Sequence, residues 1–268
     1  MRFIIIHKTN AHWETGAKPG PELIARVGSL LGELTAAGVL HAAEGLRPTS
    51  EGVRLKFFAG RRSVIDGPFE GGDELPAGFT ILRTRSIADA IEWASRQAET
   101  LGDAEIDIRP VTEPWDMGLA PRPDGNSTRR YMVLRKASAA TEADEPLVPA
   151  QRTQLSELIA ETTRTGVHLA TESFRPSARG RRYKNSRNGV SVFDGPFVET
   201  TEMIGGYAVI GAQSLAEAGR WAERYIAAVG SEEVDVFELE DTWPGPGSPD
   251  DRIPEPGSRI SDSPVAPR

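Results

Sequence analysis

Two short stretches of the chain repeat the residues Asp-Gly-Pro-Phe, at positions 66–69 and at positions 194–197. Aspartate, glycine and proline favour tight turns, so the side chains of Asp66 and Asp194 could simply cap a turn. A carboxylate at the mouth of a cavity could instead act as a general acid or base, because partial burial raises its pKa. The turn is the favoured interpretation, and both aspartates remain candidate catalytic residues.

A glutamate and an arginine stand three residues apart at two places, Glu44 with Arg47 and Glu172 with Arg175. An exposed ion pair of this kind contributes little to stability, and we favour that interpretation. The arginines could instead bind a carboxylate-bearing ligand in bidentate fashion, with a glutamate as proton acceptor. These four residues are therefore the candidate substrate-binding residues.

The chain has four histidines, of which His41 and His168 are candidate catalytic proton shuttles because imidazole titrates near neutral pH. They lie one position out of register in the two halves of the chain, so strand alternation would put them on opposite faces. His7 and His12 could lie at the rim of a cavity. The histidines lack the paired spacing of metal ligands and the chain has no cysteine. We therefore expect no metal and no other cofactor.

The densest positive patch is the run RGRRYKNSR at residues 179–187. It could be a solvated hairpin whose charges protect a sheet edge, or a contact for an acidic partner. The formal net charge of the whole chain is −8, which makes nucleic acid an unfavourable partner. The apolar run near the N-terminus is too short for a signal peptide or a membrane span, so we expect a cytoplasmic protein without membrane contact.

A constant shift of 128 positions (194 − 66 = 128) aligns the two halves of the chain almost without gaps. The shift superposes EGLRP on ESFRP, both DGPF motifs, and two pairs of tryptophans, Trp93 with Trp221 and Trp115 with Trp243. A repeat of this length is expected to be a complete domain with its own core. We predict domains at 1–115 and 129–243, a linker at 116–128 and a disordered Pro/Gly-rich tail at 244–268.

The first copy predicts a strand at 2–7, a helix from Pro21 to just before Gly38, and a strand near 39–46. A hairpin with arms near 53–58 and 63–65, a strand at 78–84, a helix capped by Ser86 and a strand at 104–111 complete it. This order predicts an α+β fold of ferredoxin-like type. We expect two tandem ferredoxin-like domains that stack their open sheet faces as an intramolecular, pseudo-dimeric α+β barrel. A cavity would lie between the two copies, and the chain would be a monomer.

The motifs carry a resemblance to a known family. The segments AAGVLHAAEGLRPT, VIDGPF and, in the second copy, DGPFVETTEMIGGY resemble the DGPF or YCII-related family of small bacterial proteins. The resemblance implies a ferredoxin-like unit that pairs into a dimeric α+β barrel. It also implies similarity, through YciI-like relatives, to muconolactone isomerase and to a His-Asp pair suggested to be catalytic, and some members are encoded near sigma factors.

Two hypotheses on function follow. In the first, the chain binds a small polar or anionic molecule in the cavity between the copies, with cofactorless acid–base catalysis as an open question. Asp66 or Asp194 would then move the proton, and Arg47 or Arg175 would hold an anionic group. The alternative is a non-catalytic regulatory or protein-interaction module linked to sigma-factor-controlled responses, with the basic run 179–187 or the tail in contact with a partner.

Overall fold

The computed structural model describes residues 1–69, 75–102, 104–197 and 203–240. The predicted disorder of the tail at 244–268 falls outside these ranges. Within them the chain forms two six-stranded antiparallel sheets and six α-helices. No helix of the described part is long and apolar enough to cross a membrane.

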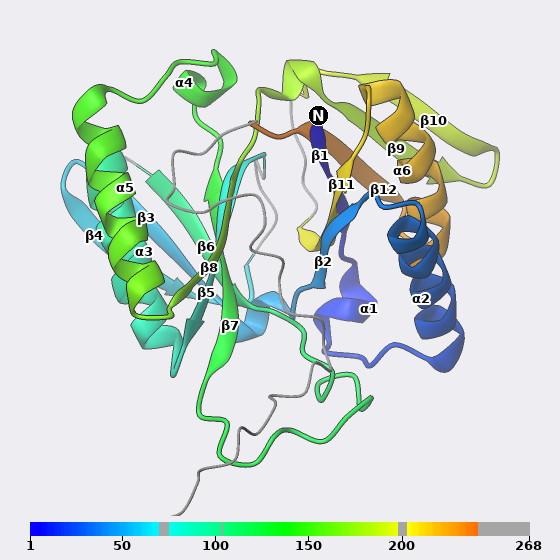
Figure 1. Ribbon diagram of the computed structural model, residues 1–268, viewed down its shortest axis with the longest axis horizontal. Helices are drawn as coiled ribbons and strands as arrows, with labels where there is room; N and C mark the ends of the chain where they lie inside the picture. Colours follow the sequence, from blue (N-terminus) through cyan, green and yellow to red (C-terminus); the bar gives the residue numbers. More distant parts are fainter. Residues whose placement is uncertain (70–74, 103, 198–202, 241–268) are drawn as a thin grey trace, which may run out of the picture.

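The first sheet has the strand order β10-β9-β12-β1-β11-β2. Helices α2 and α6 cover its outer face (Figure 1). The bounds of these elements are β1 Arg2–Lys8, β2 Leu40–Gly45, β9 Arg181–Ser186, β10 Gly189–Asp194, β11 Ile204–Gly211, β12 Glu233–Glu238, α2 Pro21–Ala36 and α6 Leu215–Val229.

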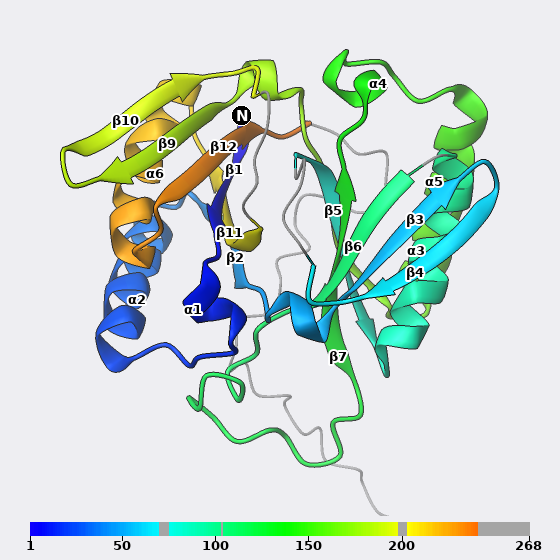
Figure 2. The same cartoon turned by 180° about the vertical axis from the view of Figure 1, so that it is seen from behind.

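The second sheet has the order β4-β3-β6-β7-β5-β8, and helices α3 and α5 lie on its outer face (Figure 2). The bounds are β3 Val53–Phe58, β4 Arg61–Asp66, β5 Pro76–Thr84, β6 Ala104–Pro110, β7 Arg129–Lys136, β8 His168–Ser173, α3 Ile87–Leu101 and α5 Pro149–Arg164. The short helices α1 Ala11–Glu14 and α4 Ala139–Glu142 and the 3-10 turns η1 Thr49–Glu51 and η2 Ser177–Arg179 lie in the connections.

The elements follow the sequence pattern closely. Helix α2 begins at Pro21, whose missing N–H costs nothing in the first turn, and ends before Gly38, which has a φ of +68°. Ser86 caps α3 by accepting a hydrogen bond from the backbone N–H of Asp89. Strand β1 is buried on both faces, as predicted, because Phe3 and Ile5 face the helices while Ile4 and Ile6 face the other sheet.

The two copies exchange strands, so neither has a core of its own. Strand β1 of the first copy lies between β11 and β12 of the second, and β7 of the second copy lies between β5 and β6 of the first. Each ferredoxin-like unit therefore joins the β-α-β half of one copy to the hairpin and second β-α-β part of the other. The expectation that each copy folds around its own core is wrong in this respect. The connection 111–128 joins β6 directly to its neighbour β7, which makes the exchange a local link along the chain.

The layers are helix, sheet, sheet and helix, with three apolar cores between them. The two sheets face each other across the central core, which is the stacked α+β arrangement expected from the sequence. Aromatic side chains fill much of this core, where the rings of Phe79 and Tyr207 lie 4.8 Å apart and those of Phe174 and Phe237 lie 5.5 Å apart. Because these rings occupy the middle of the molecule, a large cavity must lie elsewhere.

Candidate functional site

The two DGPF motifs form the same tight turn in both copies. Each glycine lies against a 3-10 turn, so that a Cβ atom on Gly67 would be 1.8 Å from the carbonyl oxygen of Thr49. A Cβ atom on Gly195 would be 1.8 Å from the carbonyl oxygen of Ser177. Both Gly-Pro peptide bonds are cis. The glycine is therefore required by close backbone contact.

The phenylalanine of each motif covers a buried arginine. The guanidinium of Arg54 lies 4.7 Å from the ring centroid of Phe69, and that of Arg182 lies 4.6 Å from the centroid of Phe197. The backbone N–H of Phe197 also donates to the hydroxyl of Ser177, at 3.1 Å. The motif thus closes the end of each sheet over an internal charge.

Each of these arginines belongs to a buried ion cluster that spans three adjacent strands. In the first sheet the Asp235 carboxylate accepts hydrogen bonds from Arg182, at 2.7 and 3.0 Å, and lies 2.8 Å from the Lys8 ammonium. Burial alone would raise the pKa of Asp235, but the charges of Lys8 and Arg182 hold it below its usual range. The second sheet repeats the cluster with the equivalent residues Arg54, Asp107 and Lys136.

The candidate catalytic aspartates lie at the exposed ends of β4 and β10. The Asp194 side chain is 75% exposed and pairs with Arg181 at 2.6 Å. Neither Asp66 nor Asp194 lines the cavity described below. The structure therefore places both in the position that the turn interpretation gives them, while their proposed catalytic role stays a prediction.

The other candidate catalytic residues also lie away from that cavity. His41 is an exposed residue of β2, beside Gly211. His168, on β8, is partly buried and its Nε2 forms a 2.7 Å hydrogen bond with the hydroxyl of Thr171. Burial lowers the pKa of His168 below its ordinary value. The structure does not bring the two histidines together.

The candidate binding residues have partners that the sequence spacing did not indicate. Glu44 accepts hydrogen bonds from Nη1 and Nη2 of Arg130, whose Nε binds Glu113 at 2.8 Å. Burial raises the pKa of the Glu44 carboxyl, against the opposing charge of Arg130. Arg47 instead binds Glu51, at 2.5 and 3.0 Å. Glu44 and Arg47 both line the cavity, but not as a pair.

The second copy repeats this arrangement across the exchanged strands. The Glu172 carboxylate accepts a 2.5 Å hydrogen bond from Arg2, the residue equivalent to Arg130. Arg175 lies 3.3 Å from the carboxylate of Asp144. Each glutamate is therefore paired with the first strand of the other copy, which links the two copies electrostatically.

A cavity of about 430 Å³ lies beneath α2, at the end of the first sheet. Helix α2 contributes Ile24, Val27 and Leu31, and Ala43 of β2 and Val229 of α6 lie on the same wall. Leu31, Ala43 and Val229 also pack on the core between the helices and this sheet. The cavity is lined by residues of both copies at the end of the first sheet. Leu31 and Ala43 border it on the helix side, and Leu46 and Tyr207 border it on the side that faces the other sheet.

His7 and Tyr225 form the polar inner part of the cavity wall. The Tyr225 hydroxyl and Nδ1 of His7 are 3.0 Å apart and form a hydrogen bond. Burial, with the positive charges of Arg109 and Lys8, lowers the pKa of His7 to about 4. Burial also raises the pKa of Tyr225 above its ordinary value. At neutral pH the pair is therefore an uncharged imidazole beside a protonated phenol.

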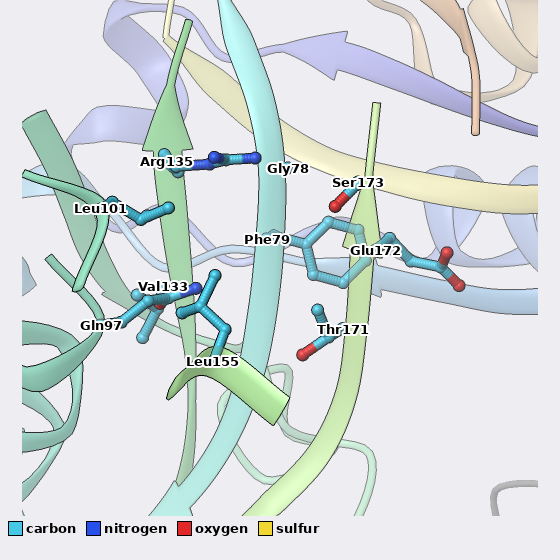
Figure 3. Close-up of a pocket in the computed structure, with 10 residues that line it drawn as sticks. All are labelled: Gly78, Phe79, Gln97, Leu101, Val133, Arg135, Leu155, Thr171, Glu172 and Ser173. Carbon is cyan, nitrogen blue, oxygen red and sulfur yellow. The ribbon is translucent and has the colours of Figure 1, made fainter. Parts of the chain in front are cut away.

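A small hollow of about 20 Å³ occupies the equivalent position in the second sheet (Figure 3). Every residue on its wall except Gly78 and Val133 has its counterpart, 128 positions away, on the wall of the large cavity. Arg135 stands where the first site has His7, and Gln97 stands where it has Tyr225. Figure 3 shows the Arg135 side chain reaching toward Gly78 on β5, and its Nη2 donates to the carbonyl oxygen of Ala77 at 3.3 Å.

Larger side chains explain why the second position is nearly filled. Four residues of the large cavity are replaced by bulkier ones at the second position: Val27 by Leu155, Ala43 by Thr171, Gly45 by Ser173 and Val229 by Leu101. Leu155 is 2% exposed. A hollow of 20 Å³ has room for about one water molecule, so only the first position can take an organic ligand.

No group of three or more metal-ligating side chains occurs among the described residues. In the run 179–187 most cations have carboxylate partners within the chain, namely Arg179 with Glu238, Arg181 with Asp194, Arg182 with Asp235 and Lys184 with Glu233. The run is therefore largely neutralised within its own sheet.

Sequence reasoning missed Tyr225 and Arg130 as site residues and gave His7 only a place at a rim. Tyr225 looks like an ordinary apolar-face residue of a helix, and its link to His7 depends on the strand exchange. A usable signal does exist in the alignment of the two copies. The positions where a buried polar residue differs between copies, His7 against Arg135 and Tyr225 against Gln97, are those that distinguish the open site from the filled one.

Comparisons with known proteins bear on the family alone. No curated protein and no solved structure matches the chain. The model of the YCII-related domain matches twice, at residues 1–114 and 130–240, and both matches include the DGPF turn and the strands of a ferredoxin-like unit. The chain therefore belongs to the YCII-related family and carries its domain in tandem.

Proposed function

We propose that the chain binds one small organic molecule in the cavity beneath α2, and that His7 and Tyr225 act on it as a cofactorless acid–base pair. The observation that carries this proposal is the difference between two equivalent positions. One is an open cavity with a buried His-Tyr pair, and the other is filled by larger side chains around Arg135 and Gln97. An empty cavity lowers the stability of the fold. A cavity that stays open where the equivalent position is packed therefore favours a ligand site.

The roles of the residues follow from their protonation. His7 is uncharged at neutral pH and can accept a proton or a hydrogen bond from a ligand, because its pKa is about 4. The Tyr225 phenol, held at 3.0 Å from Nδ1, fixes the ring orientation. Glu44, whose pKa is raised by burial, lies on the same wall. The proposal places proton transfer at His7 rather than at Asp66 or Asp194.

The alternative, an interaction module that uses the basic run 179–187, has less support. Its cations are largely occupied by carboxylates of the same sheet, so a partner would have to displace existing ion pairs. We therefore carry forward the ligand-binding proposal.

A filled-cavity variant tests the proposal directly. The four substitutions Val27→Leu, Ala43→Thr, Gly45→Ser and Val229→Leu give the first position the side chains that the second already accommodates. Ligand-observed NMR with 4-methylphenol, 4-methylbenzoate, benzylamine and cyclohexanone should detect binding of at least one probe to the wild-type chain. The filled variant should lose that binding while unfolding cooperatively at an equal or higher denaturant concentration, because filled empty volume stabilises the fold.

The matched control makes the reverse changes at the second position, Leu101→Val, Leu155→Val, Thr171→Ala and Ser173→Gly. This control should bind the probes as the wild-type chain does, since His7 and Tyr225 are untouched. Binding that persists undiminished in the filled variant, or no binding of any probe, would contradict the cavity as the site. The acid–base role requires in addition that the imidazole nitrogen signals of His7 shift when a probe binds, and unchanged signals would exclude it.

A further inference from the structure

The charges around the cavity decide which class of molecule it can take. Two of the side chains that line it, Lys8 and Arg47, are cationic. His7 also lines the cavity but is neutral at pH 7. The Lys8 ammonium is 2.8 Å from Asp235, and the Arg47 guanidinium binds Glu51 at 2.5 Å. Both cations are therefore already neutralised, and neither is available to a carboxylate or phosphate without loss of an internal pair.

The anionic side chains on the wall outnumber the cationic ones. Glu14, Glu44 and Asp116 line the cavity and have internal partners, and Glu232 is a fourth carboxylate on the wall. Asp116 lies 2.5 Å from the Arg129 guanidinium. Both cations on the wall already have carboxylate partners, so an anion would gain no free counter-ion there.

The rest of the wall is apolar. Helix α2 turns Leu23, Ile24, Val27 and Leu31 toward the cavity, and Met117 and Leu119 approach it from the connection between β6 and β7. A charged molecule would lose its hydration against this surface, which costs free energy that nothing on the wall returns. An apolar ring or chain, in contrast, is stabilised by burial in proportion to its area.

At the polar part of the wall the hydrogen-bonding groups are uncharged. The Nδ1 atom of His7 and the Tyr225 hydroxyl form one hydrogen bond with each other. Nε2 of His7 is left to donate or accept, according to the tautomer. A ligand hydroxyl can accept from Nε2–H or donate to an unprotonated Nε2, and a carbonyl oxygen can accept from Nε2–H. Both groups do so without bringing a net charge into the cavity.

Resting on the proposed function, we infer that the ligand is an uncharged, mainly apolar molecule with a single hydroxyl or carbonyl group, of the phenol or cyclic ketone class. The hydroxyl or carbonyl contacts His7, and the apolar body lies against α2. This replaces the polar or anionic molecule, held by Arg47, that the sequence suggested.

Three matched probes that share one ring size test the inference: 4-methylphenol, 4-methylbenzoate and benzylamine in its protonated form. Their dissociation constants are measured at pH 7 by ligand-observed NMR titration against the full chain and against the filled-cavity variant. We expect 4-methylphenol to bind at least tenfold more tightly than either ion, and the filled variant to lose at least tenfold of that affinity.

The outcomes separate the two proposals. If 4-methylbenzoate or benzylammonium binds as tightly as the phenol and the filled variant loses that binding, the cavity is the site but the uncharged ligand class is wrong. If the phenol binds the filled variant and the wild-type chain equally, both the site and the ligand class are overturned. The variant Arg47→Gln gives an independent check, because an uncharged ligand requires its affinity to change less than threefold, while a larger loss for the phenol contradicts the inference.

Discussion

At the scale of single residues, the environment of His7 determines its chemistry. The imidazole lies beneath α6 against Tyr225, and its neighbours Arg109 and Lys8 are positively charged. Protonation would therefore place a third positive charge in a poorly hydrated space. The same burial that prepares the ring as an uncharged acceptor makes the folded protein sensitive to acid.

The pH dependence of stability should reveal this residue. The pKa of His7 is about 4 in the folded protein, against 6.5 for an ordinary histidine. Between these values the unfolded chain takes up a proton that the folded chain refuses, so stability falls as the pH is lowered through this window. Urea unfolding at pH 7 and pH 5 should show a loss of about 2 kcal/mol that His7→Gln removes. His12→Gln, at an exposed histidine of α1, should keep the wild-type dependence, and an unchanged dependence in His7→Gln would refute the assignment.

At the scale of elements, the buried ion clusters connect neighbouring strands that come from different copies. Arg182 on β9 and Asp235 on β12 belong to the second copy, and Lys8 on β1 belongs to the first. A buried carboxylate of this kind is expensive to remove, because Lys8 would lose its counter-ion while Arg182 would keep its pair with Glu233 at 3.2 Å. The clusters therefore contribute to the specificity of strand pairing more than to gross stability.

Two aspartates of the same sheet give a matched comparison of this effect. Asp235→Asn should lower the free energy of unfolding by about 3–5 kcal/mol, because the buried Lys8 ammonium then loses the carboxylate that lies 2.8 Å from it. Asp194→Asn removes an exposed pair with Arg181 and should cost less than about 1 kcal/mol. Chemical denaturation of both variants at pH 7 measures the difference. Equal losses in the free energy of unfolding would show that the buried cluster contributes no more to stability than the exposed pair.

At the scale of the whole molecule, the strand exchange makes the two copies interdependent. A copy on its own would expose the apolar sheet face that carries Phe79 and Ile81 in the first copy and Tyr207 and Phe237 in the second. The complete chain covers both faces internally, so light scattering should find it monomeric. The cavity also depends on both copies, since it takes His7 from one and Tyr225 from the other.

Separate expression of residues 1–128 and 129–268 tests this interdependence. Neither half should be a folded monomer in light scattering, because each lacks the strands that complete its sheet. Mixing or co-expressing the halves should give a one-to-one complex that again binds 4-methylphenol. A half that folds alone as a monomer would contradict the exchanged architecture.

Much of the fold could be predicted from the sequence, because its signals are local. Pro21, Gly38 and Ser86 mark helix ends by backbone chemistry alone, and the 128-residue shift reveals the pseudo-symmetry. The strand exchange could not be predicted, since β1 could pair with equivalent strands of either copy and bury the same side chains. The same ambiguity limited the prediction of the site. Glu44 was predicted as a binding residue and does line the cavity. Its partner Arg130, and the pair of His7 with Tyr225, depend on the strand exchange and could not be predicted.

The inequality of the two equivalent positions has a consequence for how such a molecule can change. A dimer of identical subunits must carry both pockets in the same state, so any residue that opens one opens the other. Joining the copies in one chain removes that obligation, and Leu155 can pack one end of the molecule while Val27 leaves the other open. The covalent link thus lets two equivalent positions differ, one open and one packed, which identical subunits of a symmetric dimer cannot do.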